Sequence, residues 1–338
     1  MKAIYIASNG SAKDSFEIRD VAIPTISDDE VLIKVSAFGI NYADVLCRLG
    51  LYPQCPPLPA VIGYDVVGTI ESIGKNVKNL NIGDRAMALT TFGGYAEFAV
   101  ANKGSAVKID DHAPAGEALA LGAQYCTAYY CAEELIRLRK DDHVLIHAAA
   151  GGVGIALVQI AKMHGCKIFG TAGSAKKLEF LESIGVDHPI NYKESDFEDV
   201  IIDIVGKRGL DVVFDSIGGE TFRKGYSLLC SGGRIVLFGS AEITGRNKTE
   251  QLEFSKDYGS IHPAQLMMAS KAIIGVFILT VFQDKPKLAT EILQTVFKLY
   301  TEGKFKPVVD RSFSFDQIAE AHIYLESRKS IGKVLVEI

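Results

Sequence analysis

The residues with the clearest chemical potential form a glycine-rich turn near the middle of the chain. An apolar run over 143–149, typical of a strand, leads into this turn, and a helical pattern follows over 153–164. A strand, a glycine-rich turn and a helix in this order are the context of a dinucleotide-binding fingerprint, because N–H groups at the helix start bind phosphates. The turn therefore predicts dinucleotide binding; the alternative is a glycine-rich turn without a ligand. The predicted binding residues are Ala150, Gly151, Gly152, Val153 and Gly154.

The fingerprint departs from the strict GxGxxG pattern at its first position, which is Ala149. Gly151 takes the second position, where a missing side chain lets the backbone approach a pyrophosphate. Gly154 takes the third, where it permits close packing of the helix on the strand. Two of the three conformational requirements of the motif are thus met.

The segment after the next predicted strand bears on which dinucleotide is bound. NAD sites usually hold the ribose hydroxyl with an acidic residue here, but this chain has no acid before Glu179. A serine and two lysines stand there instead, Ser174, Lys176 and Lys177. A carboxylate would repel a 2′-phosphate, whereas a serine and a lysine would bind it. We therefore expect NADPH, with Gly173, Ser174 and Lys177 at its phosphate; the alternative is that the lysines are a solvated helix start.

The composition is that of a globular protein of ordinary charge. The chain has 338 residues and a net charge of −5, which argues against a nucleic-acid-binding protein. Its length suggests two domains. It opens without a secretory signal, and its six cysteines form no CxxC pair. We therefore expect six reduced cysteines in a cytoplasmic protein and no structural zinc.

Two different sequence patterns predict the strands and helices that position these residues. The first hundred residues hold short β-prone runs separated by turn residues, which predict a small barrel, and the proline-rich segment 53–59 should be a loop. From residue 143 strands alternate with helices, which predicts parallel βαβ units. The fold class is therefore α/β. Strands are predicted over 2–7, 30–37, 66–72, 85–89, 96–100, 143–149, 167–171, 211–215, 234–238, 273–279 and 332–337, and helices over 115–132, 153–164, 175–184, 197–205, 221–229, 287–301 and 315–326.

A polar, charged segment over 241–261 interrupts the alternation and is predicted to be a surface insertion. The apolar run over 272–282 that follows it is about half as long as a membrane-spanning helix must be. We expect this run to form a buried strand instead.

Motifs spread along the chain in a fixed order resemble those of one protein superfamily. They lie at 39–44, 50–53, 63–68, 83–85, 93–97, 127–129, 148–154, 215–219 and 332–335. The chain resembles the medium-chain dehydrogenase/reductase superfamily, in its zinc-free quinone oxidoreductase division, and its insertion is similar to the vesicle amine transport protein branch. The resemblance implies a GroES-like β-barrel catalytic domain over 1–124 and 283–338. It also implies a Rossmann domain, a doubly wound parallel sheet, over 125–282 with the insertion at 241–263.

The resemblance also bears on metal binding. Zinc alcohol dehydrogenases of the superfamily hold a catalytic metal with Cys, His and Glu, and the corresponding positions here are Asn41, Tyr64 and Asp65. A neutral amide and a phenol are poor zinc ligands. The four-cysteine loop that holds a structural zinc is also missing. We therefore predict no metal, and we expect Cys47, near this site, to be a packing residue.

Without a metal, the resemblance implies hydride transfer to a quinone or to the β-carbon of an α,β-unsaturated carbonyl, with hydrogen-bond donors stabilising the resulting anion. Asn41 is predicted to donate from its amide to the substrate or the ribose. Tyr52 and Tyr64 are candidate donors or proton sources; water is an alternative source, and packing an alternative role. Asp44 is predicted to orient Asn41 or a neighbouring turn rather than act as acid or base. The substrate pocket would be formed by Asn41, Tyr42, Tyr52, Tyr64 and the insertion, with the nicotinamide in a cleft between the domains.

Further cofactor contacts are implied by the resemblance. Thr127 would meet the nicotinamide amide, Tyr192 would pack near the adenosine phosphate, and Lys333 would close the site. Ordinary core packing is the alternative for the apolar members. The strand over 273–279 would also pair with its copy in a homodimer. The other predicted contacts are Ser216, Ile217, Phe238, Gly239, Ser240, Phe277, Ile278 and Leu279.

Two functions remain open at this point. The first is a cytoplasmic NADPH-dependent reductase of quinones or α,β-unsaturated carbonyls. The second is an NADPH-binding scaffold or vesicle-associated protein with little turnover, in which the insertion docks on a partner or on a membrane surface. A plain solvated loop is the alternative role of the insertion.

Overall fold

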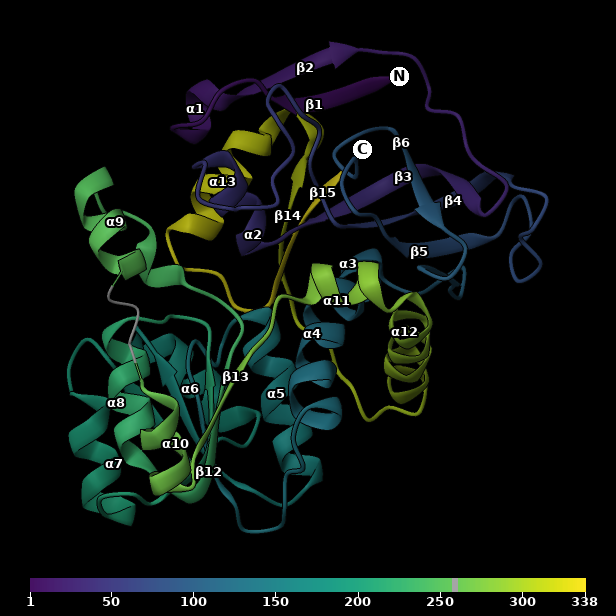
Figure 1. Ribbon diagram of the computed structural model, residues 1–338. Coiled ribbons are helices and arrows are strands. Elements are labelled where there is room, and N and C mark those ends of the chain that lie inside the picture. Colours follow the sequence, from purple (N-terminus) through teal and green to yellow (C-terminus); the bar gives the residue numbers. More distant parts are fainter. Residues whose placement is uncertain (257–260) are drawn as a thin grey trace. The chain divides into compact units, whose positions relative to one another are not determined.

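The computed structural model describes residues 1–256 and 261–338, and these form two compact units (Figure 1). Unit 1 comprises Met1–Cys126 and Val281–Ile338, so it contains both ends of the chain. Unit 2 comprises Thr127–Thr280. Part of the predicted insertion, over 257–260, lies outside the described residues.

Unit 1 is built on a seven-stranded sheet that draws strands from both ends of the chain. Only β14 and β15 are parallel; the other pairs are antiparallel. The order is β14 (Val309–Ser314), β15 (Lys333–Glu337), β3 (Glu30–Ile40), β4 (Asp65–Ile73), β5 (Arg85–Leu89) and β7 (Ala106–Lys108), with β6 (Phe98–Asn102) also on β3. A hairpin of β1 (Lys2–Ile6) and β2 (Phe16–Asp20) stands apart from this sheet.

The register of β15 on β3 brings the last strand of the chain to Asn41, in the motif over 39–44. Val334 lies opposite Ile40 in this antiparallel pair, so Lys333 falls beside Asn41. β4 lies on the other side of β3 and begins at Asp65. The ends of three neighbouring strands therefore meet where Asn41 leaves the sheet.

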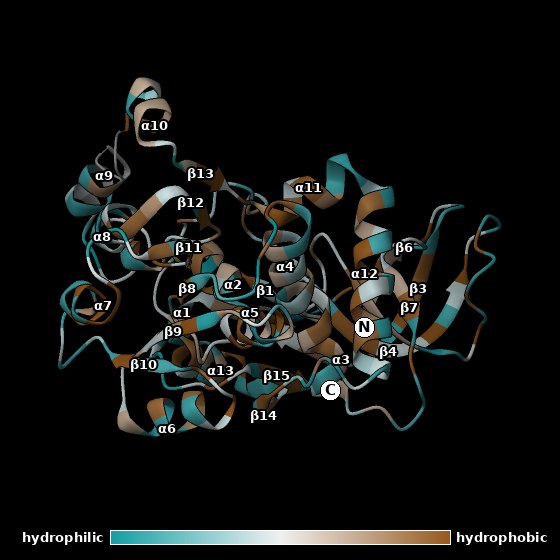
Figure 2. Cartoon of the chain, turned by 90° about the horizontal axis from the view of Figure 1, so that it is seen from below, coloured by the Kyte–Doolittle hydropathy of each residue, from teal (hydrophilic) through white to brown (hydrophobic). Residues whose placement is uncertain are grey.

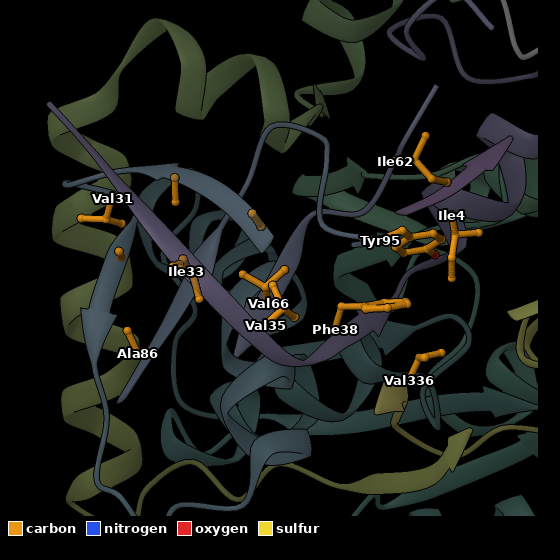
Figure 3. Close-up of a cluster of buried hydrophobic side chains, with 14 of the residues drawn as sticks. Ile4, Val31, Ile33, Val35, Phe38, Ile62, Val66, Ala86, Tyr95 and Val336 are labelled. Carbon is orange, nitrogen blue, oxygen red and sulfur yellow. The ribbon is translucent and has the colours of Figure 1, made fainter. Parts of the chain in front are cut away.

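The core of unit 1 is a cluster of β-branched and aromatic side chains on the inner face of its strands. Ile4, Ile33 and Val66 are fully buried there. Figure 3 shows Phe38 and Tyr95 packed side by side in this cluster, with ring centroids 4.6 Å apart. Because burying a large apolar side chain contributes about 1.5–3 kcal/mol, this cluster holds the site-bearing strands in place.

The helices of unit 1 cover the sheet and its connections. α12 has apolar and polar residues side by side along its length (Figure 2), and its buried residues include Ile292 and Val296. The helices are α1 (Ala12–Ser15), α2 (Tyr42–Arg48), α3 (Ala115–Ala120), η1 (Leu121–Tyr125), α12 (Pro286–Thr301), η4 (Phe315–Gln317) and α13 (Ile318–Glu326).

Unit 2 contains a six-stranded, all-parallel sheet, which confirms the predicted doubly wound class. Helices α5 (Gly152–Met163) and α8 (Glu220–Leu228) lie on opposite faces of this sheet (Figure 1). Central strands such as β11 are buried on both faces, which explains their unbroken apolar sequence. The strand order is β10 (His188–Asn191), β9 (Lys167–Ala172), β8 (His143–Ile146), β11 (Leu210–Asp215), β12 (Leu229–Leu237) and β13 (Ala272–Gly275).

The other helices of the second half fill the connections between strands. α6 precedes β10 along the chain, α7 follows it, and both helices contact it. The remaining helices are α4 (Cys126–Tyr129), η2 (Tyr130–Glu134), α6 (Ala175–Ser183), α7 (Phe197–Val205), η3 (Ala241–Ile243), α9 (Lys248–Lys256), α10 (Pro263–Ala269) and α11 (Ile278–Asp284).

The prediction of a buried strand over 273–279 is wrong. β13 ends at Gly275, its residues are half-buried or exposed, and α11 begins at Ile278. The reason is the limited length of the neighbouring strand. β12 ends at Leu237, whose carbonyl accepts the N–H of Val276, so the chain beyond Val276 has no strand to pair with. Ile278 and Leu279 are therefore helical residues, and Phe277 is an exposed link.

The predicted surface insertion is only partly exposed. Its described residues include η3 and α9, and the side chain of Phe254 is 6% exposed. The Arg246 guanidinium lies 5.1 Å from the Phe254 ring and pairs with Glu242. The described part of the insertion therefore packs on itself.

The expectation of six reduced cysteines is also wrong. Cys47 and Cys55 form a disulfide with their Cα atoms 5.4 Å apart, so Cys47 is not the simple packing residue expected. The segment 53–59 is a loop, as predicted. The backbone N–H of Cys55 donates to the carbonyl of Tyr52, and the loop folds back toward α2 so that the sulfur atoms of Cys55 and Cys47 are bonded. The other four cysteines are free.

Candidate functional site

Asn41 occupies the junction between β3 and α2. It is the N-cap of α2, and its backbone N–H donates to Oδ2 of Asp44 at 2.7 Å. This reciprocal contact is a capping box, which fixes the direction in which the helix leaves the strand. Asp44 thereby orients the backbone of Asn41.

The side chain of Asn41 is held by a buried ion pair. Its Nδ2 donates to Oδ1 of Asp65 at 2.5 Å, and its Oδ1 accepts from the Lys333 ammonium at 3.1 Å. Lys333 Nζ also lies 2.6 Å from Oδ2 of Asp65, and both charged side chains are 0% exposed. The Lys333 cation can only donate and so faces the amide oxygen, whereas the Asp65 anion can only accept and so faces the amide nitrogen. The amide therefore has one orientation, with one N–H left to donate to another group.

Gly39 makes room for this ion pair. A Cβ atom at Gly39 would lie 1.9 Å from Oδ2 of Asp65 and 2.3 Å from Nζ of Lys333. Any side chain here would displace one of the charges. The glycine two residues before Asn41 is therefore required by the arrangement of the site.

A second group of buried polar side chains surrounds Asp44. Burial raises the pKa of Asp44 to about 7, the hydrogen bond from Asn41 lowers it, and the Asp65 carboxylate raises it further. Burial also raises the pKa of Tyr52 to about 12 and that of Tyr64 still more. The rings of Tyr52 and Tyr64 lie 6.3 Å apart, edge to face. These phenols are therefore proton donors and not anions at neutral pH.

In unit 2 the glycine-rich turn has the geometry expected of an anion-binding helix start. The helix α5 begins at Gly152, and among the described residues no protein acceptor takes the N–H groups of Gly152, Val153 and Gly154. A Cβ atom at Gly154 would lie 2.5 Å from the carbonyl oxygen of Ala148. Free N–H groups at a close-packed helix start fit a diphosphate.

Several predicted phosphate contacts gather at the end of β9. Ser174 is the N-cap of α6, with an exposed side chain that makes no capping hydrogen bond. A Cβ atom at Gly173 would lie 2.6 Å from the Tyr192 hydroxyl and 3.2 Å from Cε of Lys193. Gly173, Tyr192 and Lys193 therefore lie together, beside the helix that carries Lys177.

The remaining predicted cofactor contacts lie on the loops after β11 and β12, in the glycine-rich turn and on α4. Loops after β11 and β12 place Ser216 against Gly239, since a Cβ at Gly239 would lie 2.7 Å from the Ser216 carbonyl oxygen. Parallel strands end at one edge of their sheet, so these loops follow the same edge as the glycine-rich turn. Ile217, Phe238 and Ser240 lie on these loops, Ala150 lies in the turn, and Thr127 is a buried residue of α4.

Three residues near the predicted site were not found by sequence reasoning. Lys193 directly follows Tyr192. The signal that could have identified it is its positive charge, next to a residue already predicted to lie near the phosphate. Tyr95 and His322 are fully buried and their side chains meet at 3.1 Å, between the Tyr95 hydroxyl and Nε2 of His322. They lie far apart in sequence and belong to no common motif, so no local signal could pair them.

Comparison with known proteins places the chain in a superfamily. Residues 27–111 match the family model described as alcohol dehydrogenase GroES-like domain, and residues 152–295 match the model described as zinc-binding dehydrogenase. The human quinone oxidoreductase is 32% identical over 323 residues, which cover 95% of this chain and 93% of that protein. The chain belongs to the medium-chain dehydrogenase/reductase superfamily. This confirms the family resemblance and the pairing of a GroES-like fold with a Rossmann fold.

This medium-chain dehydrogenase/reductase is also similar to a vesicle membrane protein homolog and to a solved quinone oxidoreductase structure. The synaptic vesicle membrane protein VAT-1 homolog of Danio rerio is 33% identical over 317 residues, which cover 93% of this chain but 65% of that protein. The crystal structure of Escherichia coli quinone oxidoreductase complexed with NADPH is 26% identical, with a TM-score of 0.87 and full coverage of both chains.

The residues at the superfamily's zinc positions do not fit a zinc ion in this member. Asn41 and Tyr64 offer an amide and a phenol, and both oxygens of Asp65 already contact other groups of the protein. The Lys333 ammonium provides the positive charge in this cluster. Over residues 1–256 and 261–338 no group of three His, Cys, Asp or Glu side chains is placed to hold a metal.

Proposed function

We propose that this medium-chain dehydrogenase/reductase is an NADPH-dependent oxidoreductase that reduces quinones or α,β-unsaturated carbonyls without zinc. The observation that carries the proposal is the Lys333–Asp65–Asn41 cluster at the superfamily's zinc positions. A neutral amide held by an ion pair cannot act as a Lewis acid, but it can donate a hydrogen bond to an acceptor that is already electron-poor. Quinones and conjugated carbonyls are such acceptors.

The cofactor is assigned to the residues of unit 2. Bound NADPH supplies a hydride. The free N–H groups of Gly152, Val153 and Gly154 would bind the diphosphate, and Ser174, Lys177 and Tyr192 would bind the 2′-phosphate. The lack of an acid at the end of β9 favours NADPH over NADH because no carboxylate opposes the extra phosphate.

The acceptor is assigned to the residues around Asn41. The remaining N–H of the Asn41 amide would donate to the acceptor oxygen or to the ribose. The buried hydroxyls of Tyr52 and Tyr64 would donate to the oxygen on which negative charge develops. Because their pKa values are raised, these phenols remain protonated and keep their donor capacity at neutral pH.

The test is oxidation of NADPH, followed by its absorbance, in the presence of a small quinone and, separately, of an enone. We expect turnover with at least one acceptor class, preference for NADPH over NADH, and no loss of rate with a strong chelator. Asn41→Ala should lower the rate while leaving NADPH affinity nearly unchanged. Binding of NADPH without turnover on a broad panel of acceptors, or inhibition by the chelator, would contradict the proposal.

The proposal includes a homodimer. β13 is the last strand of its sheet, and a parallel sheet with an open edge is stabilised when a second strand covers that edge. A second copy of β13, related by a two-fold axis, would provide that strand. Light scattering should give twice the chain mass of 36.6 kDa.

A second candidate function is docking to a membrane or a vesicle partner, and the similarity to VAT-1 homologs favours it. None of the helices in the described ranges is both long and apolar enough to span a bilayer. Docking would therefore be peripheral, and Met267 and Met268 on α10 are 75% and 76% exposed. Co-sedimentation of the native protein and of a Met267→Ser/Met268→Ser variant with anionic vesicles tests it; equal recovery of both without vesicle dependence would rule it out.

A further inference from the structure

Ala148, at the start of the glycine-rich turn, has an unusual backbone conformation. Its φ is +50°, in the left-handed region, although it is not a glycine. This conformation costs an L-residue about tenfold in population, and alanine has no polar side chain that could offset the cost by a local hydrogen bond. Such a conformation persists only where the surrounding structure holds it. Other groups of unit 2 must therefore hold Ala148 in place.

Neighbouring strands bind the backbone on both sides of Ala148. The N–H of His147 donates to the Phe214 carbonyl of β11 at 3.0 Å, and the N–H of Ala149 donates to the Thr171 carbonyl of β9 at 3.0 Å. The N–H of Ala148, between them, donates to a side chain instead, to Oγ1 of Thr171 at 3.3 Å. One residue of β9 thus binds two successive N–H groups of the turn.

The imidazole of His147 sets the direction of the Thr171 hydroxyl. Nδ1 of His147 lies 3.1 Å from Oγ1 of Thr171, and both residues are 3% exposed. Because the hydroxyl oxygen accepts the Ala148 N–H, its hydrogen is left to donate to Nδ1, which a neutral imidazole can accept. Burial lowers the pKa of His147, and the Asp215 carboxylate opposes this effect. Among the described residues Nε2 has no hydrogen-bond partner, so Thr171 is the partner of this ring.

The conformation of Ala148 determines how the first turn of α5 packs. Its carbonyl oxygen accepts the N–H of Gly151 at 2.8 Å. The same oxygen would lie 2.5 Å from a Cβ atom at Gly154 and 3.2 Å from one at Gly151. Rotation of Ala148 out of the left-handed region would move this oxygen, and the N–H groups of Gly152, Val153 and Gly154 would lose their arrangement.

We propose that Thr171 and His147 are positioning residues for NADPH, which hold Ala148 in its left-handed conformation and so present the start of α5 to the diphosphate. The inference rests on the proposed function, because that function assigns the diphosphate to this helix start. Neither side chain belongs to the assigned cofactor or acceptor contacts, and both act through the backbone of Ala148. Since NADPH and NADH share the diphosphate, both nucleotides depend on these two residues.

The first test compares nucleotide affinities by fluorescence titration. Thr171→Val keeps the approximate shape of the side chain and removes the acceptor of the Ala148 N–H. We expect NADPH and NADH each to bind about tenfold more weakly, the factor by which a left-handed alanine is disfavoured. Thr171→Ser keeps the hydroxyl and should bind both nucleotides nearly as the native protein does. Native affinity in Thr171→Val, or a loss confined to NADPH, would overturn the proposal.

The second test asks whether the loss passes through Ala148. Ala148→Gly alone should change affinity little, because the native protein already populates the left-handed conformation. In the Thr171→Val background the same glycine should restore most of the lost affinity, since glycine adopts this conformation without help. A general loss of stability would not be recovered in this way. The double variant binding as weakly as Thr171→Val would therefore refute the role of Ala148.

The contribution of His147 is measured with a double-mutant cycle. His147→Leu removes the acceptor of the Thr171 hydroxyl and should weaken both nucleotides about threefold. Because the two side chains act on one N–H group, His147→Leu/Thr171→Val should lose less affinity than the product of the two single losses. Losses that multiply would show that His147 acts independently of Thr171, contrary to the inference.

Turnover adds a readout that separates binding from chemistry. With an acceptor that the native protein reduces, Thr171→Val should raise the KM for NADPH and leave kcat at saturating NADPH nearly unchanged, because Thr171 touches no reacting atom. Thr290→Val is the matched control, since its hydroxyl also donates to a main-chain carbonyl, that of Gly104 at 2.8 Å, but in unit 1. It should keep both constants. A lower kcat with an unchanged KM in Thr171→Val would count against a positioning role.

These measurements separate failure of this inference from failure of the proposed function. If the native protein binds NADPH but reduces no acceptor, the proposed function fails, and the affinities alone decide the inference. If it binds neither nucleotide, both are wrong. If it turns over and the variants match it, the proposed function stands and the inference is wrong. Should Thr171→Val not fold, His147→Leu with and without Ala148→Gly gives the same comparison.

Discussion

The Lys333 ammonium lies 2.6 Å from Oδ2 of Asp65, with both side chains fully buried. Two strands that are remote in sequence, β15 and β4, carry these charges to either side of β3. The family resemblance predicts that zinc-dependent members hold a metal at the positions of Asn41, Tyr64 and Asp65, and here the pair orients the Asn41 amide. Its first consequence is for stability, because an isolated charge at this depth cannot be hydrated.

Removal of one charge should therefore be much worse than removal of both. We expect Lys333→Met to lower the free energy of unfolding of unit 1 by about 3–5 kcal/mol, since it leaves Asp65 buried and unpaired. The double variant Lys333→Met/Asp65→Asn should recover much of the loss. Urea unfolding followed by circular dichroism measures both. A double variant that is less stable than the sum of the two single variants would show that the pair does not act as one unit.

Cofactor preference should depend on Lys177 more than on its neighbour. Lys177→Ala is expected to weaken NADPH binding about tenfold, because a hydrogen bond to a charged group contributes about 1.5–3 kcal/mol. NADH binding should be unchanged. Lys176→Ala is the matched control, with the same charge change one residue away on an exposed side chain. Fluorescence titration with each nucleotide gives the affinities; equal effects of the two variants would point to a diffuse charge effect.

Local periodicity was sufficient to predict much of unit 2. The helix over 197–205 and the strand-turn-helix around Gly151 have the bounds or the order that the sequence indicated, because each is determined by apolar spacing and by glycine within one short segment. β10 was missed, since a strand of four residues with a proline carries little pattern. β13 was overextended because an apolar run does not show where its partner strand ends.

Long-range relationships in unit 1 could not be predicted in the same way. The contact of Lys333 with Asn41 joins positions 292 residues apart, and it depends on the register of β15 on β3. The Cys47–Cys55 disulfide depends on how the proline loop folds back, which spacing alone does not determine. The family resemblance named Asn41, Asp44 and Lys333 individually but not the contacts among them.

The helix start of α5 should not tolerate a side chain at Gly154. Gly154→Ala would place a methyl group 2.5 Å from the Ala148 carbonyl oxygen. The turn must then open, and we expect a loss of about 1–3 kcal/mol in stability together with loss of NADPH binding. Gly275→Ala is the control, because nothing lies within 4 Å of its added Cβ. Thermal unfolding with and without NADPH reports both effects; a Gly154→Ala protein with native affinity would contradict the assigned role of the turn.

The disulfide should be visible as a count of thiols. Alkylation of the denatured, unreduced protein should modify four cysteines, Cys126, Cys131, Cys166 and Cys230, and prior reduction should raise the count to six. Mass spectrometry gives the number. A Cys47→Ala/Cys55→Ala variant should lose about 2–3 kcal/mol of stability, as expected for a short closed loop. Six modified cysteines without reduction would show that the pair is not oxidised in solution.

The buried carboxyl of Asp44 should make stability fall as pH rises. Its pKa is about 7 in the folded protein and about 3.9 in an unfolded chain. Between these values the unfolded state releases a proton that the folded state keeps, so the contribution of Asp44 to stability decreases from about pH 4 to pH 7 and then levels off, by on the order of 4 kcal/mol at most. Asp44→Asn should remove this decrease and be more stable than the native protein above pH 7.

His322 contributes with the opposite sign, over a pH range that overlaps that of Asp44. Its pKa is lowered to about 3, against about 6.5 in an unfolded chain. The unfolded state therefore gains a proton first as pH falls below about 6.5, and stability is lost down to about pH 3. Because the two contributions oppose each other between about pH 4 and 6.5, the single variants separate them. Urea unfolding at fixed intervals from pH 3 to 9 should show stability that rises with pH over this range in Asp44→Asn and falls with pH in His322→Gln. A variant whose profile matches that of the native protein would contradict the titration assigned to its residue.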